Sequence, residues 1–152
     1  MKTAKLALAV LPALLLAWSA AADEGEPAPE APVAPYATGG QELVGPMWRL
    51  TELNGELAAE DVETTLDFSE DGQIGGNGGC NAYGGDYEIS GEDLTFSNVF
   101  STLMACPDEK TPQERAFFDV LEQTRRYEVA EGELLLKGEE DTILARLAEQ
   151  TP

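Results

Sequence analysis

The sequence predicts an α+β fold that is mostly antiparallel β, a sheet or small barrel accompanied by one helix. Two observations predict this class. Short segments of alternating apolar and polar residues recur every eight to twelve residues, with Gly, Asn, Asp and Ser turns between them. One segment, beginning near residue 111, instead has helix-start signals and apolar residues at helical spacing.

The first half of the predicted domain consists of strands and hairpins. Residues 47–53 (MWRLTEL), with Trp48, Leu50 and Leu53, are predicted to form a strand that ends at Asn54-Gly55, a pair that favours a tight hairpin turn. Two further hairpins follow, each with a polar turn between its strands. Their predicted strands are residues 64–68, 73–76, 85–89 and 94–96.

The helix is predicted to begin at Thr111 and to end near Thr124. Thr111 is the predicted N-cap, Pro112 occupies the first helical position, and Glu114 lies three residues after the cap, which completes a capping box. The predicted buried face contains Phe117, Val120, Leu121 and Thr124, with Phe118 beside it. Three more strands are predicted at residues 126–129, 134–137 and 143–147.

Residues 1–22 have the pattern of a secretory signal peptide, in which two lysines precede an apolar run that ends in small residues. Residues 23–44, rich in Pro, Ala and Glu, are predicted to be a disordered linker. Residues 45–149 then suffice for one folded domain. No cysteine follows the apolar run, so we expect no lipid anchor and a soluble periplasmic or secreted protein.

The chain is strongly acidic, with a formal net charge of −20 at pH 7. Binding to nucleic acid requires Lys and Arg to neutralise phosphates, and anionic membranes repel an acidic surface. We therefore expect neither as a partner. The charge favours either simple solubility or a surface for cations and basic partners.

The stretch GGNGGCN at residues 75–81 raises the question of a phosphate-binding loop. A dinucleotide fingerprint fails because Asn81 stands where its last glycine is required, and no Gly-Lys-Ser/Thr follows for a nucleotide loop. Glycines instead favour a sharp bend or a close approach of backbones. We interpret the stretch as structural.

A calcium loop is the strongest metal hypothesis. Asp67, Ser69 and Asp71 have the spacing of the first ligands of such a loop, but its twelfth position is Gly78 instead of glutamate. A hairpin turn with acidic tips is the favoured alternative. The chain has no histidine, and two cysteines cannot complete a zinc site.

Cys80 and Cys106 are the two cysteines of a chain that we expect to be exported. In an oxidising compartment such a pair is expected to form a disulfide. The alternative is two buried thiols that never meet. The spacing is not Cys-x-x-Cys, which argues against a redox role.

Two separated motifs then resemble the META domain family, which includes heat-shock and envelope proteins of the HslJ type. The first motif is GCNAYGG at residues 79–85 and the second is TLMAC at residues 102–106, with Trp48 and Asn54-Gly55 ahead of them and Glu114 behind. The matching residues are Trp48, Gly79, Cys80, Asn81, Tyr83, Gly84, Thr102, Met104, Ala105 and Cys106.

The resemblance implies a small, mostly antiparallel sheet, partly closed like a barrel, with one helix packed on it. It also implies an envelope-associated bacterial protein linked to stress tolerance, antibiotic resistance or secretion, with no established enzymatic activity. The motif residues carry over as structural or surface candidates. Thr102 and Met104 are expected to pack around the disulfide, and Asn81 and Thr102 near Tyr83 are the first choice for a binding patch.

The functional hypothesis is a non-catalytic module that binds an envelope protein, a peptide or a small apolar ligand, without cofactor or catalytic residues. The absence of histidine excludes Ser-His-Asp and Cys-His arrangements. One alternative is a glycan hydrolase that uses a pair of carboxylates. Another is a calcium-binding envelope protein with Asp67, Ser69 and Asp71 as ligands.

Overall fold

The computed structural model describes residues 40–150. The predicted signal peptide and residues 23–39 of the predicted linker lie outside this range. The described part contains nine strands, one α-helix and one short 3₁₀ turn. They are β1 (Met47–Leu53), β2 (Glu56–Leu57), β3 (Thr65–Phe68), β4 (Gln73–Asn77), β5 (Ala82–Ser90), β6 (Asp93–Ser101), α1 (Thr111–Gln123), β7 (Arg126–Ala130), β8 (Glu133–Lys137), η1 (Glu139–Asp141) and β9 (Ile143–Gln150).

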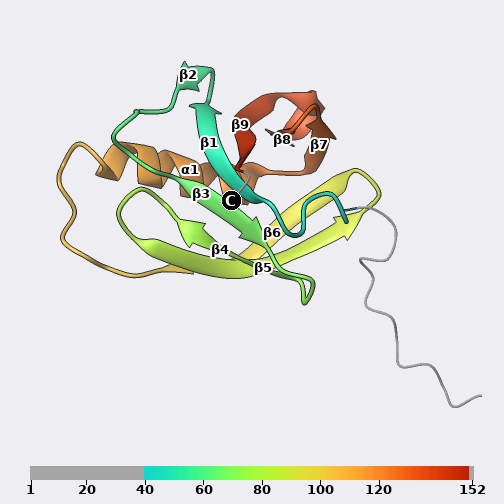
Figure 1. Cartoon of the computed structure of the whole chain (residues 1–152), viewed down its shortest axis with the longest axis horizontal. Coiled ribbons are helices and arrows are strands. Elements are labelled where there is room, and N and C mark those ends of the chain that lie inside the picture. The colour runs from blue at the N-terminus through green and yellow to red at the C-terminus, as the bar shows by residue number, and fades with distance from the viewer. Residues whose placement is uncertain (1–39, 151–152) are drawn as a thin grey trace, which may run out of the picture. The chain divides into compact units, whose positions relative to one another are not determined.

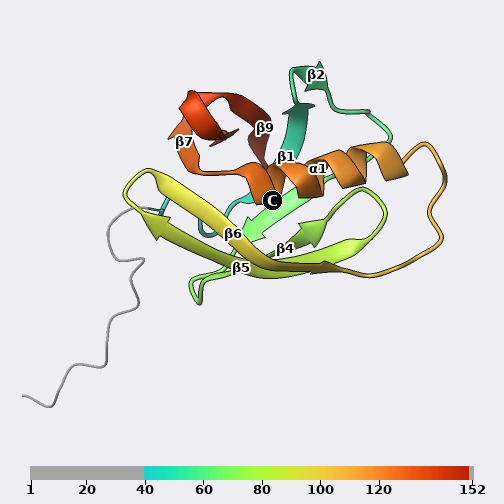
Figure 2. The ribbon, with the colours of Figure 1, turned by 180° about the vertical axis from the view of Figure 1, so that it is seen from behind.

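The strands form one antiparallel sheet that closes into a ring. Their order is β2-β1-β3-β4-β5-β6-β7-β8-β9, and β1 also pairs with β9 (Figure 1). The ring is weakest between β6 and β7, which pair only at Asp93 and Arg126. Helix α1 lies between these two strands in the chain and runs alongside β6 (Figure 2). The predicted fold class, mostly antiparallel β with one helix, is confirmed.

The core lies where the helix meets the inward side of the sheet. Phe117, Val120 and Leu121 are fully buried, as the helical spacing predicts. Tyr83 packs edge-on against Phe117, with ring centroids 5.7 Å apart, and against Phe118 at 5.4 Å. Because each buried large side chain contributes about 1.5–3 kcal/mol, this cluster fixes the helix on the sheet.

The packed domain begins earlier than the linker boundary predicted at residue 44. Leu43 is completely buried, and its carbonyl accepts a hydrogen bond of 3.1 Å from the indole Nε1 of Trp48. A buried indole N–H requires an acceptor, and residues 40–44 supply it. These five residues therefore belong to the folded unit.

Strands β5 and β6 are longer than the sequence pattern predicts. Gly84 and Gly85 lie inside β5, and the pairing with β6 shifts register between Gly84 and Asp86. The shift is accompanied by a positive φ of 51° at Asn98. Glycines and a bulge interrupt the alternation of side chains, which is why the ends of these strands could not be recognised.

Candidate functional site

Asn81, directly before β5, is the centre of a buried hydrogen-bond network. Its Oδ1 accepts hydrogen bonds from the hydroxyl of Thr102 (3.0 Å) and from the backbone N–H of Met104 (2.7 Å). Its Nδ2 donates to Oε1 of Glu114 (2.7 Å) and lies 3.3 Å from Sγ of Cys106. One amide thus joins the helix to the segment that follows β6.

Glu114 completes the network from the first turn of α1. Its Oε2 accepts hydrogen bonds from the backbone N–H groups of Cys80 (3.0 Å) and Asn81 (2.7 Å). Burial by itself raises the pKa of Glu114, but the hydrogen bonds from the side chain and backbone of Asn81 and from Cys80 lower it below its ordinary value. The carboxylate is therefore held as an anion.

The predicted capping box at the start of α1 is wrong. The cap position is Lys110 and no side chain caps the helix, so Thr111 is the first helical residue and Pro112 the second. Glu114 turns instead toward the bend between β4 and β5, where two backbone N–H groups need an acceptor. The spacing from Thr111 alone could not reveal this more distant partner.

The predicted disulfide joins Cys80 to Cys106, whose Cα atoms are 5.9 Å apart. It ties the β4–β5 bend to the segment after β6. The neighbouring hydrogen bonds of Asn81 attach that segment at Thr102 and Met104 as well. Residues 102–106 are therefore fixed by the disulfide, by their hydrogen bonds to Asn81 and by a backbone hydrogen bond from Thr102 to the carbonyl of Ala82.

The fixed segment presents apolar side chains to solvent. Leu103 is 97% exposed, Met104 is 60% exposed, and Phe100 at the end of β6 is 70% exposed. The backbone N–H of Met104 donates to Asn81, whereas its side chain is exposed and does not pack around the disulfide as expected. We call Leu103 and Met104 the apolar loop.

The glycine stretch at residues 75–81 forms the end of β4 and the bend that leads to β5, where backbones and side chains meet closely. Gly76 and Gly79 have positive φ values of 147° and 136°. A Cβ on Gly79 would lie 2.8 Å from the side chain of Val62, and one on Gly78 would lie 2.8 Å from Phe118. The stretch joins two strands, as the structural interpretation expects.

Several motif residues serve the core. Trp48 and Tyr83 are buried, and the hydroxyl of Tyr83 donates to the carbonyl of Thr65 at 2.7 Å. Burial, with the charge of Asp67, raises the pKa of Tyr83 well above its ordinary value, so the hydroxyl remains a donor. The structure joins Asn81 to Thr102, but Asn81 and Tyr83 are covered and do not form an open patch.

The proposed calcium ligands lie in the β3–β4 hairpin. Asp67 is in β3, where it pairs with Gly75, while Ser69 and Asp71 belong to the turn. The carbonyl of Ser69 accepts hydrogen bonds from Gly72 and from the hydroxyl of Tyr87. Within residues 40–150, no three His, Cys, Asp or Glu side chains gather in a group suited to a metal.

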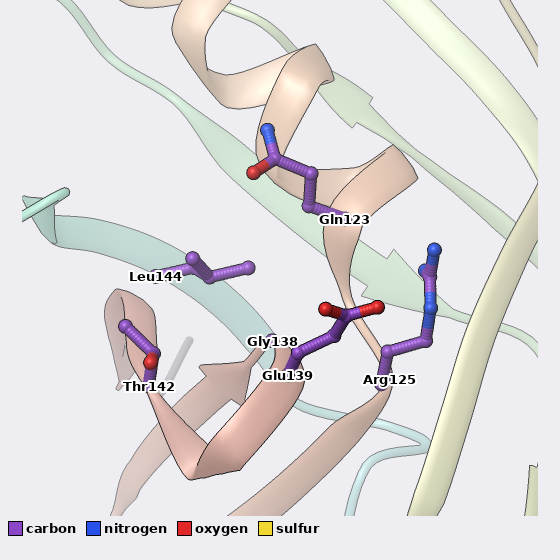
Figure 3. A pocket seen from close by; sticks show the side chains of 6 residues that line it. All are labelled: Gln123, Arg125, Gly138, Glu139, Thr142 and Leu144. Atoms are coloured by element: carbon purple, nitrogen blue, oxygen red, sulfur yellow. The ribbon is translucent and has the colours of Figure 1, made fainter.

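A hollow of about 420 Å³ lies beside the end of α1. Gln123 and Arg125 line one side, and Glu139, Thr142 and Leu144 line the other (Figure 3). Nη1 of Arg125 donates to the carbonyls of Glu122 (2.8 Å) and Thr124 (2.7 Å). Arg125 thus satisfies the last carbonyls of the helix, a structural role.

Comparisons with known proteins identify the family from the sequence and, separately, similar folds among solved structures. Residues 41–151 match the family model of the META domain. No curated protein matches the sequence.

In the part of the chain that the structure describes, no helix has the length and apolar character needed to span a membrane.

Solved structures similar to this chain show the same fold at low sequence identity. An NMR structure of a protein from Burkholderia xenovorans has a TM-score of 0.60 and 24% identity, covering 86% of this chain and 97% of that one. A crystal structure of a DUF4847 family protein from Bacteroides vulgatus has a TM-score of 0.54 and 15% identity. It covers 72% of this chain and 96% of its own.

Proposed function

This chain belongs to the META domain family, and on that premise we propose that it is a non-catalytic interaction module of the cell envelope. In this proposal the protein is exported, contributes to stress or antibiotic tolerance, and binds a protein partner through the apolar loop. The observation that carries the proposal is the exposure of Leu103 and Met104 on a segment fixed from beneath.

Exposing an apolar side chain to water costs free energy, and a segment that is free to move would turn such side chains toward the protein. Leu103 and Met104 stay in solvent because Thr102, Met104 and Cys106 are attached to Asn81 and Cys80 below. A loop ordered before binding loses less conformational entropy when a partner arrives. The arrangement therefore supports a preformed contact surface.

The chemistry of the network supports a non-catalytic role. Glu114 has a lowered pKa and uses both carboxylate oxygens for hydrogen bonds inside the protein. A general acid needs the opposite, a raised pKa and access to substrate. Both cysteines are joined in the disulfide, so neither supplies a thiolate nucleophile.

The disulfide also bears on location. Disulfides persist in oxidising compartments, so the Cys80–Cys106 bond is consistent with a periplasmic or secreted protein. Export is the expectation from residues 1–22, and the proposal adopts it. The intact mass of the purified protein, measured with thiol alkylation before and after reduction, tests cleavage and disulfide together.

The binding role is tested by site-specific photocrosslinking in the cell envelope. A photoreactive phenylalanine analogue replaces Leu103 in one variant and Leu57, an equally apolar and 86% exposed residue of β2, in the control. We expect a discrete adduct from position 103 and none from position 57. Equal adducts at both positions, or hydrolysis of envelope glycan that one carboxylate substitution abolishes, would overturn the proposal.

A further inference from the structure

The outward face of β3, β4, β5 and β6 contains a row of directly paired residues. Asp67 of β3 pairs with Gly75 of β4, Gly75 pairs with Gly84 of β5, and Gly84 pairs with Phe100 of β6. Directly paired residues of neighbouring strands share one face of a sheet. A carboxylate and an aromatic ring therefore flank two glycines.

The ring of Phe100 lies over Gly84. A Cβ added to Gly84 would come within 2.8 Å of the ring, so the glycine is what lets the ring lie there. The space above Gly75 is open, because a Cβ there would meet only the carbonyl oxygen of Tyr83, at 3.7 Å. The surface between Asp67 and Phe100 is therefore formed by the backbone of Gly75 and Gly84, without side chains.

Asp67 lacks a counter-charge on this face. It is half-buried, and its side chain makes no hydrogen bond or ion pair with the residues of the range 40–150. Burial raises the pKa of its carboxyl above the ordinary value. Arg49 is diagonally opposite on β1 by register, yet it forms no ion pair in that range. A half-buried carboxylate without a counter-charge carries a desolvation cost, and a cation supplied by a partner would offset it.

The spacing of the row fits one cation. Strands lie about 4.8 Å apart, so Asp67 and the ring over Gly84 are separated by roughly 10 Å of sheet. An ammonium or guanidinium group reaches a ring centroid within about 6 Å and a carboxylate oxygen at about 2.8 Å. The two reaches add to about 9 Å, close to that separation, so a single cation above Gly75 lies within range of both groups once the Asp67 side chain covers the remaining distance.

We infer that this face, resting on the proposed function, binds a Lys or Arg side chain of the partner polypeptide between Asp67 and Phe100, above Gly75. Charge complementarity selects this occupant, because the chain has a net charge of −20 and β5 adds Asp86 and Glu88 to the same face. Met47, opposite Asp67 on β1, and Phe100 offer apolar surface to the stem of the side chain.

The test is an NMR titration of the ¹⁵N-labelled full chain. The probes are two synthetic peptides of alternating Leu and Ser, identical except for a central Lys in one and an uncharged norleucine in the other. We expect the Lys peptide to shift the amides of Gly75, Gly84 and Phe100 and to bind about tenfold more tightly than the norleucine peptide at low salt.

Three variants localise the effect. Gly75→Val places a side chain in the space between Asp67 and Phe100, at a position without left-handed φ. Asp67→Asn removes the charge with little change in shape. Both are expected to lose the tenfold preference for Lys. Ser97→Val, on the same face of β6, is the control and is expected to keep it. Thermal melting of each variant verifies folding, and Asp67→Asn keeps the test valid if Gly75→Val is unstable.

Three outcomes overturn this inference. In the first, both peptides bind alike and shift only the amides of Leu103 and Met104, which leaves the proposed function intact. In the second, the face shifts with protein concentration alone, so that a second copy of the chain is the occupant. In the third, neither peptide shifts the face, and the crosslinking at position 103 then decides the proposed function separately.

Discussion

Glu114 in the first turn of α1 accepts a hydrogen bond of 2.7 Å from the side-chain amide of Asn81, which stands 33 residues earlier in the chain. The contact joins the helix to the bend between β4 and β5. Through Oδ1 of the same amide it also positions Thr102 and Met104. The exposed loop therefore depends on a carboxylate that is itself buried.

Removing the Glu114 carboxylate is expected to destabilise the fold. Glu114→Ala leaves the backbone N–H groups of Cys80 and Asn81 without an acceptor, which costs about 3 kcal/mol of unfolding free energy. Urea denaturation measures the loss. The control is Glu122→Ala on the exposed side of the same helix, expected to change stability by less than about 0.5 kcal/mol. Equal effects would show that Glu114 has no special role.

The lowered pKa of Glu114 predicts a specific dependence of the unfolding free energy on pH. Its folded-state pKa is lowered, so its contribution is complete well above the ordinary pKa of about 4.3 and is lost as pH falls through the folded value. The stability difference between the wild type and Glu114→Gln should therefore shrink in acid. Unfolding free energies between pH 7 and pH 3 measure it. A difference that stays constant with pH contradicts the prediction.

Reduction of the Cys80–Cys106 disulfide is expected to lower stability by about 3.5 kcal/mol on the chain-entropy model, given the sequence separation of 26. Thermal melting with and without reductant, together with Cys80→Ser/Cys106→Ser, measures the loss. Reductant should leave the double variant unchanged. A further decrease in that variant would point to an effect of reductant unrelated to this bond.

Two adjacent glycines are expected to respond differently to alanine. Gly76 has a left-handed φ, and its Cβ would collide with the backbone carbonyl of Thr65, so Gly76→Ala should cost at least about 2 kcal/mol. Gly75 has neither restriction, and Gly75→Ala should stay within about 1 kcal/mol of wild type. Denaturation of both variants tests the pair, and equal losses would contradict the assigned backbone geometry.

The apolar loop is expected to contribute little to stability. Leu103→Ser alters a side chain that is 97% exposed, so the unfolding free energy should change by less than about 0.5 kcal/mol. Leu66→Ser, at a fully buried position of β3, is the destabilising counterpart. If Leu103→Ser destabilises comparably, the loop packs in solution against another surface of the protein.

Much of the fold follows from local pattern. Strand β1 occupies the predicted residues 47–53: Trp48 and Leu50 alternate toward the core, and Leu53 is buried after the register shift between Leu50 and Glu52. The buried face of α1 likewise follows from helical spacing. Local pattern failed at β2, a two-residue strand, and at the glycine-containing start of β5, where no alternation marks the backbone.

The sequence by itself determined the family, through the motifs around Cys80 and Cys106, and it determined the strand–helix order, because side-chain periodicity is a local property. Only the tertiary structure decided that Glu114 accepts a hydrogen bond from Asn81 and that β1 pairs with β9. It also decided that the space above Gly75, between Asp67 and Phe100, is open. These relationships join residues far apart in the chain. They depend on strand register and packing, which no local pattern specifies.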